Sequence, residues 1–154
     1  MSLYKKLLNK LINKKILIST AESCTGGLLA YSFIKNQDSS KIFRAGYITY
    51  SNELKIKELN VKKDSLKKFG AVSSQVADEM LKGLYKKNKT NICISTTGIA
   101  GPGGATKNKP VGLVYIGIRT NKKIIILKKY FKGTRIQIQK QCVNFIFRYL
   151  DKLI

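Results

Sequence analysis

The chain has 154 residues, of which 44% are apolar and only two are proline, and its net charge at pH 7 is +22. This length predicts a single domain over residues 1–154, since a chain of about 150 residues can bury roughly 70% of its unfolded surface around one core. No apolar run approaches the roughly 18 residues that a membrane-spanning helix requires. The absence of histidine excludes Ser-His-Asp and Cys-His nucleophile pairs and histidine metal sites. We therefore predict no metal ligand set.

Three cysteines, Cys24, Cys93 and Cys142, are too few and too widely spaced for a disulfide framework or a CxxC metal site. This pattern favours a reducing cytoplasm. Charges are threaded through the apolar residues of Met1–Leu8, which is unlike a signal peptide. We expect this segment to be a helix of the mature protein.

Lysine supplies 26 of the 30 positive charges, because arginine occurs at only four positions. Arginine is the residue that reads bases and phosphates with a planar fork of donors. The lysines are scattered in pairs rather than gathered in a block, which favours a solvated surface. No helix-turn-helix or RNP motif is present, so we expect no specific nucleic-acid partner and no membrane partner.

The first half of the chain alternates helix and strand patterns. Leucine and isoleucine recur at helical spacing between Leu3 and Ile12, and the apolar run at residues 15–19 predicts a buried strand. Residues 28–34 are again compatible with a helix, and residues 43–50 are rich in β-formers.

Three helices are predicted next. Ser51 or Asn52 can cap a short helix that runs through Leu59. Asp64 begins a second short helix, with Gly70 at its expected end. A longer helix follows, capped by Ser73, and its expected core-facing residues are Val76, Met80, Leu81 and Leu84.

The last third of the chain predicts a strand at residues 91–96, then a β-hairpin of residues 111–119 and 123–131 joined across 120–122. Residues 134–154 predict a closing helix, whose core-facing residues are Ile138, Cys142, Phe145, Ile146 and Leu150. The order of elements predicts the α/β class, as a three-layer α/β/α sandwich around a mixed sheet with a C-terminal β-hairpin and closing helix.

The segment Thr20–Gly27 places hydroxyl and thiol groups and two glycines where the first strand meets a helix start. Free N–H groups at a helix N-terminus can bind an anion or stabilise an oxyanion. An ordinary turn, with Thr20 or Ser23 as the N-cap of the helix, explains the same residues equally well. The local pattern leaves both interpretations open.

A second glycine-rich segment, Thr97–Gly104, follows the predicted strand at residues 91–96. It fits neither of two familiar phosphate motifs, because Gly104 stands where a Walker A loop needs lysine and Thr106 where the dinucleotide fingerprint needs its third glycine. Its place beyond the carboxyl end of a strand is nevertheless the usual ligand crevice of open α/β sheets.

Without histidine, a serine nucleophile needs another base, and Lys55 is a candidate because it follows Tyr50 across a predicted strand-to-helix junction. A lysine can take a proton from serine only when it is neutral, which requires burial or cationic neighbours to lower its pKa. Taken alone, the position of Lys55 favours the interpretation as a solvated helix lysine over that as a base.

Four segments together resemble the CinA C-terminal domain family, which contains the nicotinamide-nucleotide amidases. They are TAESCTGGLLA at residues 20–30, GYITYSNELK at 46–55, GAVSSQVA at 70–77, and STTGIAGPGG at 95–104 with KPVG at 109–112. The resemblance implies a cytoplasmic enzyme without a cofactor that deamidates nicotinamide mononucleotide to nicotinic acid mononucleotide and ammonia.

The resemblance assigns catalytic roles to Ser23 as nucleophile and to Lys55 as base, acting directly or through Tyr50. Cys24 is the competing nucleophile, since a helix N-terminus can lower the pKa of a thiol. The residues expected to bind the substrate or its oxyanion are Cys24, Thr25, Gly26, Gly27, Thr97, Gly98, Gly101, Gly103 and Arg135.

The chain departs from the family pattern near its last helix, where Thr134 replaces the usual acid and Gln139 stands where a second arginine is frequent. These departures motivate an alternative, a nucleotide-binding or regulatory module with the same pocket but no turnover. The charge of +22 motivates another, a basic nucleic-acid-associated protein. A homodimer is the expected assembly, and a small-molecule nucleotide the expected partner.

Overall fold

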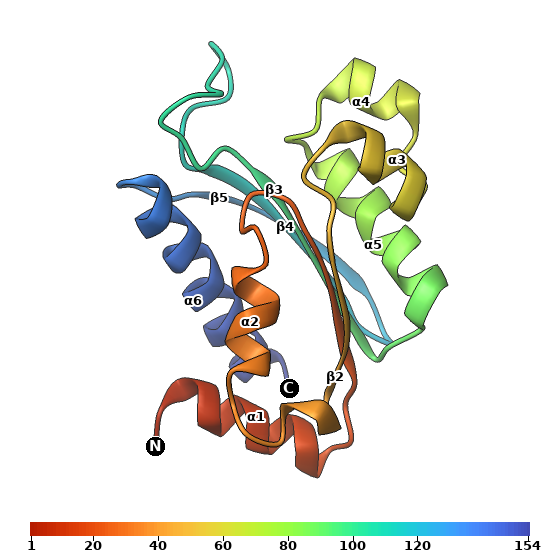
Figure 1. Cartoon of the computed structure of the whole chain (residues 1–154), viewed down its shortest axis with the longest axis vertical. Helices are drawn as coiled ribbons and strands as arrows, with labels where there is room; N and C mark the ends of the chain where they lie inside the picture. Colours follow the sequence, from red (N-terminus) through yellow and green to blue (C-terminus); the bar gives the residue numbers. More distant parts are fainter.

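The computed structural model describes every residue from Met1 to Ile154. A five-stranded sheet in the order β2-β1-β3-β4-β5 lies between two layers of helices (Figure 1). The strands are β1 (Ile18–Glu22), β2 (Phe43–Ile48), β3 (Ile92–Gly98), β4 (Leu113–Arg119) and β5 (Ile124–Tyr130). The helices are α1 (Leu3–Asn13), α2 (Leu28–Ile34), α3 (Asn52–Leu59), α4 (Lys63–Phe69), α5 (Ser74–Asn88) and α6 (Arg135–Leu153), with a short 3-10 helix, η1 (Ser39–Lys41).

The sheet is mixed. Strand β1 pairs in parallel with both β2 and β3, whereas β4 is antiparallel to β3 and to β5. The β4–β5 hairpin closes where the Thr120 N–H donates to the Lys123 carbonyl at 2.9 Å. The predicted three-layer sandwich with a C-terminal hairpin and closing helix is confirmed.

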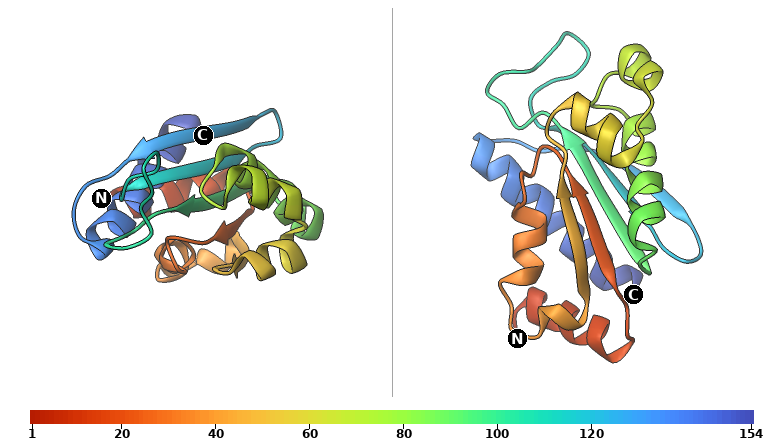
Figure 2. Two further views of the ribbon diagram at one scale, coloured as in Figure 1. Left: turned by 90° about the horizontal axis from the view of Figure 1, so that it is seen from above. Right: turned by 45° about the vertical axis from the view of Figure 1, so that its right-hand side comes forward.

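Helices α1, α2 and α6 lie on one side of the sheet, and α3, α4 and α5 lie on the other, where α5 packs on the strands and α3 and α4 pack on α5 (Figures 1 and 2). The first layer buries the larger apolar cluster, which includes Leu11, Phe33 and Phe147. The second buries a smaller cluster that includes Leu59 and Met80. No helix combines the length and the apolar character that a membrane crossing requires.

Strand β1 lies three residues later than the pattern predicts. The chain first turns at Lys15, which has a left-handed backbone (φ 54°), and the Ile16 N–H then donates to the Leu11 carbonyl at 2.9 Å. The strand therefore starts at Ile18 and ends at Glu22, with all five residues buried. This shift places Ser23 directly at the carboxyl end of the strand.

Helix α2 covers the predicted residues, Leu28–Ile34, but its cap differs from the prediction. Neither Thr20 nor Ser23 is the N-cap; Gly27 (φ 100°) occupies that position and makes no side-chain cap hydrogen bond. The other predicted caps are confirmed: Ser51 caps α3, Ser73 caps α5, and Gly70 ends α4 with φ 78°. Of the residues predicted to bury one face of α6, only Phe145 is half-exposed.

Candidate active site

The carboxyl ends of β1, β2 and β3 meet at one edge of the sheet because the three strands are parallel (Figure 2). Ser23 follows β1, Thr49 and Tyr50 follow β2, and the glycine-rich loop follows β3. The Ser23 N–H donates to the Thr96 carbonyl at 3.0 Å, and the Thr49 N–H donates to the Glu22 carbonyl at 2.9 Å. Backbone pairing therefore continues past the strands and fixes the segments that carry the site.

Glu22 holds the segment between β1 and α2 in place. Its side chain is fully buried, and one carboxylate oxygen accepts hydrogen bonds from the N–H groups of Gly27 at 3.2 Å and Leu29 at 3.0 Å. The other oxygen accepts the Ala30 N–H at 3.0 Å, and the Thr25 hydroxyl also donates to the carboxylate. A buried carboxylate thus caps α2, which supplies the partners that a buried charge requires.

This cap changes the expected origin of an oxyanion site. The N-terminus of α2 is already occupied by Glu22, so it is not open to a bound anion. The Gly26 N–H donates to the Ser23 carbonyl at 3.1 Å, and the Gly27 N–H belongs to the cap. Of the predicted donors near the nucleophile, only the N–H groups of Cys24 and Thr25 donate neither to a backbone carbonyl nor to Glu22.

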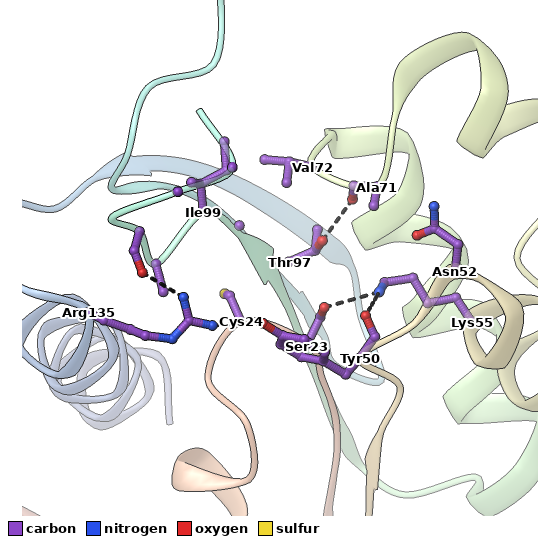
Figure 3. Close-up of a pocket in the computed structure, with 15 residues that line it drawn as sticks. Ser23, Cys24, Tyr50, Asn52, Lys55, Ala71, Val72, Thr97, Ile99 and Arg135 are labelled. Atoms are coloured by element: carbon purple, nitrogen blue, oxygen red, sulfur yellow. Dashed lines mark hydrogen bonds between the residues drawn. The ribbon is translucent and has the colours of Figure 1, made fainter. Parts of the chain in front are cut away.

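Lys55 and Ser23 form a buried pair (Figure 3). The Lys55 side chain is 1% exposed, and its Nζ lies 3.0 Å from Ser23 Oγ, 2.8 Å from the Thr49 carbonyl and 3.2 Å from the Tyr50 carbonyl. The two carbonyls can only accept. When the amine is neutral, its two N–H groups donate to them, and its lone pair remains for the Ser23 hydroxyl proton.

Burial lowers the pKa of Lys55 to about 8, an effect that the nearby Cys24 thiol partly offsets. An ordinary lysine has a pKa near 10.4. The neutral form, which the base role requires, is therefore accessible near physiological pH. No acidic side chain makes an ion pair with Lys55, so no opposite charge offsets the desolvation of its ammonium form.

The pKa of Cys24 is shifted in the direction that disfavours its reactive form. Burial raises the pKa of its thiol to about 12 against smaller lowering contributions that include its own backbone N–H and the Thr96 hydroxyl. The helix that was expected to lower this pKa begins only at Leu28. The thiolate is thus disfavoured, and the geometry favours Ser23 over Cys24 as the nucleophile.

A pocket of about 300 Å³ opens over this pair. Its lining includes the predicted residues Ser23, Cys24, Tyr50, Lys55, Thr97, Gly98, Gly101, Gly103 and Arg135. Thr25, Gly26 and Gly27 do not line it; they lie in a separate shallow hollow beside α6. The structure therefore brings together nine of the twelve predicted site residues.

Arg135 spans the mouth of the pocket. Its guanidinium donates to the Gly101 carbonyl at 2.6 Å and to the Tyr50 hydroxyl at 2.7 Å. The phenol of Tyr50 makes no hydrogen bond to Ser23 or Lys55, and Tyr50 meets the lysine through its backbone carbonyl instead. The direct Ser23–Lys55 contact therefore makes a proton relay through the Tyr50 phenol unnecessary.

Four residues that contribute to the site were not among the predicted site residues: Glu22, Ala71, Val72 and Gln139. Glu22 was read only as part of a motif, Ala71 and Val72 line the pocket from the segment before α5, and Gln139 donates from α6 to the Cys24 carbonyl at 3.0 Å. The Thr97 hydroxyl donates to the Ala71 carbonyl at 2.7 Å, so this side chain joins two walls of the pocket. An acid at the end of a buried strand whose other residues are uncharged was the one local signal available for Glu22.

No group of three or more His, Cys, Asp or Glu side chains is arranged to hold a metal ion. The fold and the site together define an α/β protein with a buried serine–lysine pair at the carboxyl edge of its parallel strands. Residues 1–154 match the CinA C-terminal domain family. The chain belongs to that family.

The chain is similar to known proteins across nearly its whole length. A CinA-like protein of Fusobacterium nucleatum is 51% identical over 141 residues, which are 92% of this chain and 34% of that protein. A crystal structure of a CinA superfamily protein from Klebsiella pneumoniae 700603 superposes with a TM-score of 0.93 at 30% identity, covering 97% of this chain and 94% of that one. The competence/damage inducible protein CihA from Agrobacterium tumefaciens superposes with a TM-score of 0.90 at 33% identity, covering 99% and 96%. The chain spans about a third of the length of the curated relatives it matches.

Proposed function

We propose that this protein is an amidohydrolase that converts nicotinamide mononucleotide and water to nicotinic acid mononucleotide and ammonia, with Ser23 as nucleophile and Lys55 as base. The observation that carries the proposal is the 3.0 Å contact between Lys55 Nζ and Ser23 Oγ, made by a lysine that is 1% exposed. The family to which the chain belongs contains nicotinamide-nucleotide amidases, which supplies the substrate class.

In the first half of the reaction, Ser23 Oγ attacks the carboxamide carbon and its proton passes to Lys55 Nζ. The tetrahedral intermediate carries its negative charge on the former carbonyl oxygen. The C–N bond then breaks and Lys55 returns the proton to the departing nitrogen. Ammonia departs, and the acyl group remains on Ser23 as an ester. The neutral form of Lys55 is restored at the end of this half.

In the second half, a water molecule attacks the ester carbon and gives a proton to Lys55. Collapse of the second tetrahedral intermediate breaks the bond to Ser23 Oγ, which takes the proton back from Lys55. The product is the carboxylic acid nucleotide. The same lysine thus serves as base and acid in turn, as microscopic reversibility requires.

The nucleotide's phosphate needs donors, and Arg135 at the pocket mouth has guanidinium N–H groups beyond the two that it uses for Gly101 and Tyr50. The glycine-rich loop adds backbone at Gly101, Gly103 and Gly104. The lysines that produce the charge of +22 raise the local concentration of anionic ligands over a longer range.

The test is to incubate the protein with nicotinamide mononucleotide and EDTA, and to measure ammonia and nicotinic acid mononucleotide. We expect turnover that survives EDTA and is lost in Ser23→Ala and Lys55→Met. Lys57→Met is the matched control, because Lys57 lies on the same helix and is exposed. Absence of turnover together with a nucleotide-dependent rise in Tm would support the binding-module alternative instead.

A further inference from the structure

The β3–β4 loop, residues 99–112, projects past the end of the sheet beside the pocket (Figure 1). Its base is closed by backbone pairing: the Gly112 N–H donates to the Ile99 carbonyl at 2.7 Å, and the Ile99 N–H donates to the Leu113 carbonyl at 2.9 Å. The glycines of residues 101–104 line the pocket. The loop therefore supplies a wall of the pocket that is anchored by the sheet at its base.

Beyond this base, two hydrogen bonds join the loop to the rest of the protein. On the side of α6, Arg135 donates to the Gly101 carbonyl at 2.6 Å. On the side of α4, Lys109 Nζ donates to the Phe69 carbonyl at 2.5 Å. The remaining hydrogen bonds of residues 100–109 run between Thr106 and Lys109, within the loop itself. The outer part of the loop is thus fastened at two points, to two different helices.

The contact of Lys109 with α4 occupies a defined place in the fold. The Phe69 carbonyl lies at the end of α4, where helix carbonyls lack partners within the helix and a cation is favoured. Lys109 is partly buried and makes no ion pair with an acid. A Cβ at Gly70 would lie only 3.1 Å from Lys109 Nζ. The glycine after α4 therefore leaves the space that the lysine uses.

This contact joins two walls of the pocket. The chain that leaves α4 after Phe69 reaches Ala71 and Val72, which line the pocket on the side away from Arg135 (Figure 3). The Thr97 hydroxyl already ties Ala71 to the end of β3. Lys109 itself does not line the pocket. It therefore fixes how the loop sits against the opposite wall, without a contact of its own to a bound ligand.

We propose that Lys109 is a positioning residue, which fastens the β3–β4 loop to the end of α4 and so holds the loop's glycines in the position that receives the substrate. The inference rests on the proposed function for its kinetic test. Without the contact, the loop is held only at its base and by Arg135, so the binding position becomes one of several that it occupies. Apparent affinity then falls by the fraction of molecules in that position.

The kinetic experiment compares Lys109→Met with Lys107→Met on nicotinamide mononucleotide. Methionine keeps a long unbranched side chain but has no N–H to donate. Lys107 lies in the same loop and is exposed. Both variants remove one positive charge, so the long-range attraction of an anionic nucleotide changes alike in the two.

We expect Lys109→Met to raise KM roughly 10-fold, the effect of losing a hydrogen bond from a charged donor. Its kcat should stay within about threefold of the parent, because the Lys55 amine contacts Ser23, Thr49 and Tyr50 and no residue of the loop. Lys107→Met should change neither constant more than about twofold. Lys109→Arg keeps a charged donor and should bring KM back to within about threefold of the parent.

Three kinetic outcomes would overturn the proposal. The first is a KM in Lys109→Met equal to that of the parent. The second is an equal rise of KM in Lys107→Met, which would make charge alone the cause. The third is a KM as high in Lys109→Arg as in Lys109→Met.

Cleavage by trypsin tests the fastening without any substrate. Lys107 is the only residue of the loop after which trypsin cuts, because the bond after Lys109 precedes Pro110. A protease cuts a folded protein at a segment that leaves its folded position. Formation of the fragment 1–107, followed by mass spectrometry, should be about 10-fold faster in Lys109→Met than in the parent. Lys122→Met, in the turn between β4 and β5, should cleave at the parent rate.

The two assays separate this inference from the proposed function. Cleavage at the parent rate in Lys109→Met contradicts the fastening role whatever the substrate is. Absence of turnover in the parent contradicts the proposed function alone, and faster cleavage of Lys109→Met with rescue in Lys109→Arg would still support the fastening role.

Discussion

The lowered pKa of Lys55 makes the pH dependence of the reaction the sharpest prediction. With a pKa of about 8, roughly 1% of Lys55 is neutral at pH 6, about 9% at pH 7 and about 90% at pH 9. We expect kcat/KM to rise roughly 90-fold from pH 6 to pH 9 and then level off. At pH 7 the neutral fraction of an ordinary lysine, with a pKa near 10.4, would be roughly 200-fold smaller.

The pH profile is measured by ammonia release from nicotinamide mononucleotide at fixed ionic strength. The same pH range is then covered with a second assay, the rate at which a fluorophosphonate labels Ser23. Lys55→Arg should lose about 10²- to 10⁴-fold in rate because a guanidinium stays protonated. Lys57→Met, on the same helix, should follow the parent profile. A flat profile between pH 6 and pH 9, or a rise that continues beyond pH 10, would refute the assignment of Lys55 as the base.

The lowered pKa of Lys55 also makes the unfolding free energy of the protein depend on pH. Unfolded Lys55 keeps its proton up to about pH 10.5, whereas the folded protein releases it near pH 8, so the unfolded chain binds more protons between these values. Stability should therefore rise with pH through this window. Relative to Lys55→Met, the parent should gain about 2 kcal/mol of unfolding free energy between pH 7 and pH 9.5 in urea titrations. An unchanged difference between the two proteins would show that Lys55 is not desolvated.

Three further substitutions test the surroundings of the pair. Cys24→Ala should keep activity within a fewfold, and iodoacetamide should leave native Cys24 unlabelled at pH 8, because burial raises the pKa of its thiol to about 12; rapid labelling would contradict this. Glu22→Gln should lose about 2–4 kcal/mol by thermal melting, since an amide cannot accept every donor that the carboxylate serves; an unchanged Tm would show that the cap is dispensable. Gly83→Ala should destabilise α5 although alanine favours helices by about 1 kcal/mol, because a Cβ there would overlap the Leu59 carbonyl oxygen; a raised Tm would show that the two helices can separate freely.

The elements of the fold could be predicted because their signals are local. Apolar residues at helical spacing mark α1, α5 and α6, and Ser51 and Ser73 cap their helices as hydroxyl residues commonly do. The bounds of β1 could not, since its start depends on a left-handed residue at Lys15. That conformation is uncommon for lysine and leaves no mark in the sequence pattern.

The residues of the candidate site were harder to predict from local sequence patterns than the helices and strands. Lys55 is one of 26 lysines, and only its place against β1 and β2 buries it, so the resemblance to a family was needed to single it out. The capping role of Glu22 depends on its buried carboxylate lying beside the first turn of α2, which the expected cap residues Thr20 and Ser23 did not indicate. The Gln139–Cys24 contact joins residues 115 positions apart, and no spacing rule covers such a distance.

The contacts of α6 also constrain when the site can exist during synthesis. Ser23 and Lys55 leave the ribosome early, but Arg135 and Gln139, which meet Gly101 and Cys24, come from the last helix. A nascent chain that ends before α6 carries the nucleophile and the base without the groups that brace them, and it leaves the apolar face that α6 covers open to water. On the proposed mechanism, a chain that ends before α6 therefore lacks the contacts of Arg135 and Gln139 that brace Gly101 and Cys24 beside the proposed nucleophile.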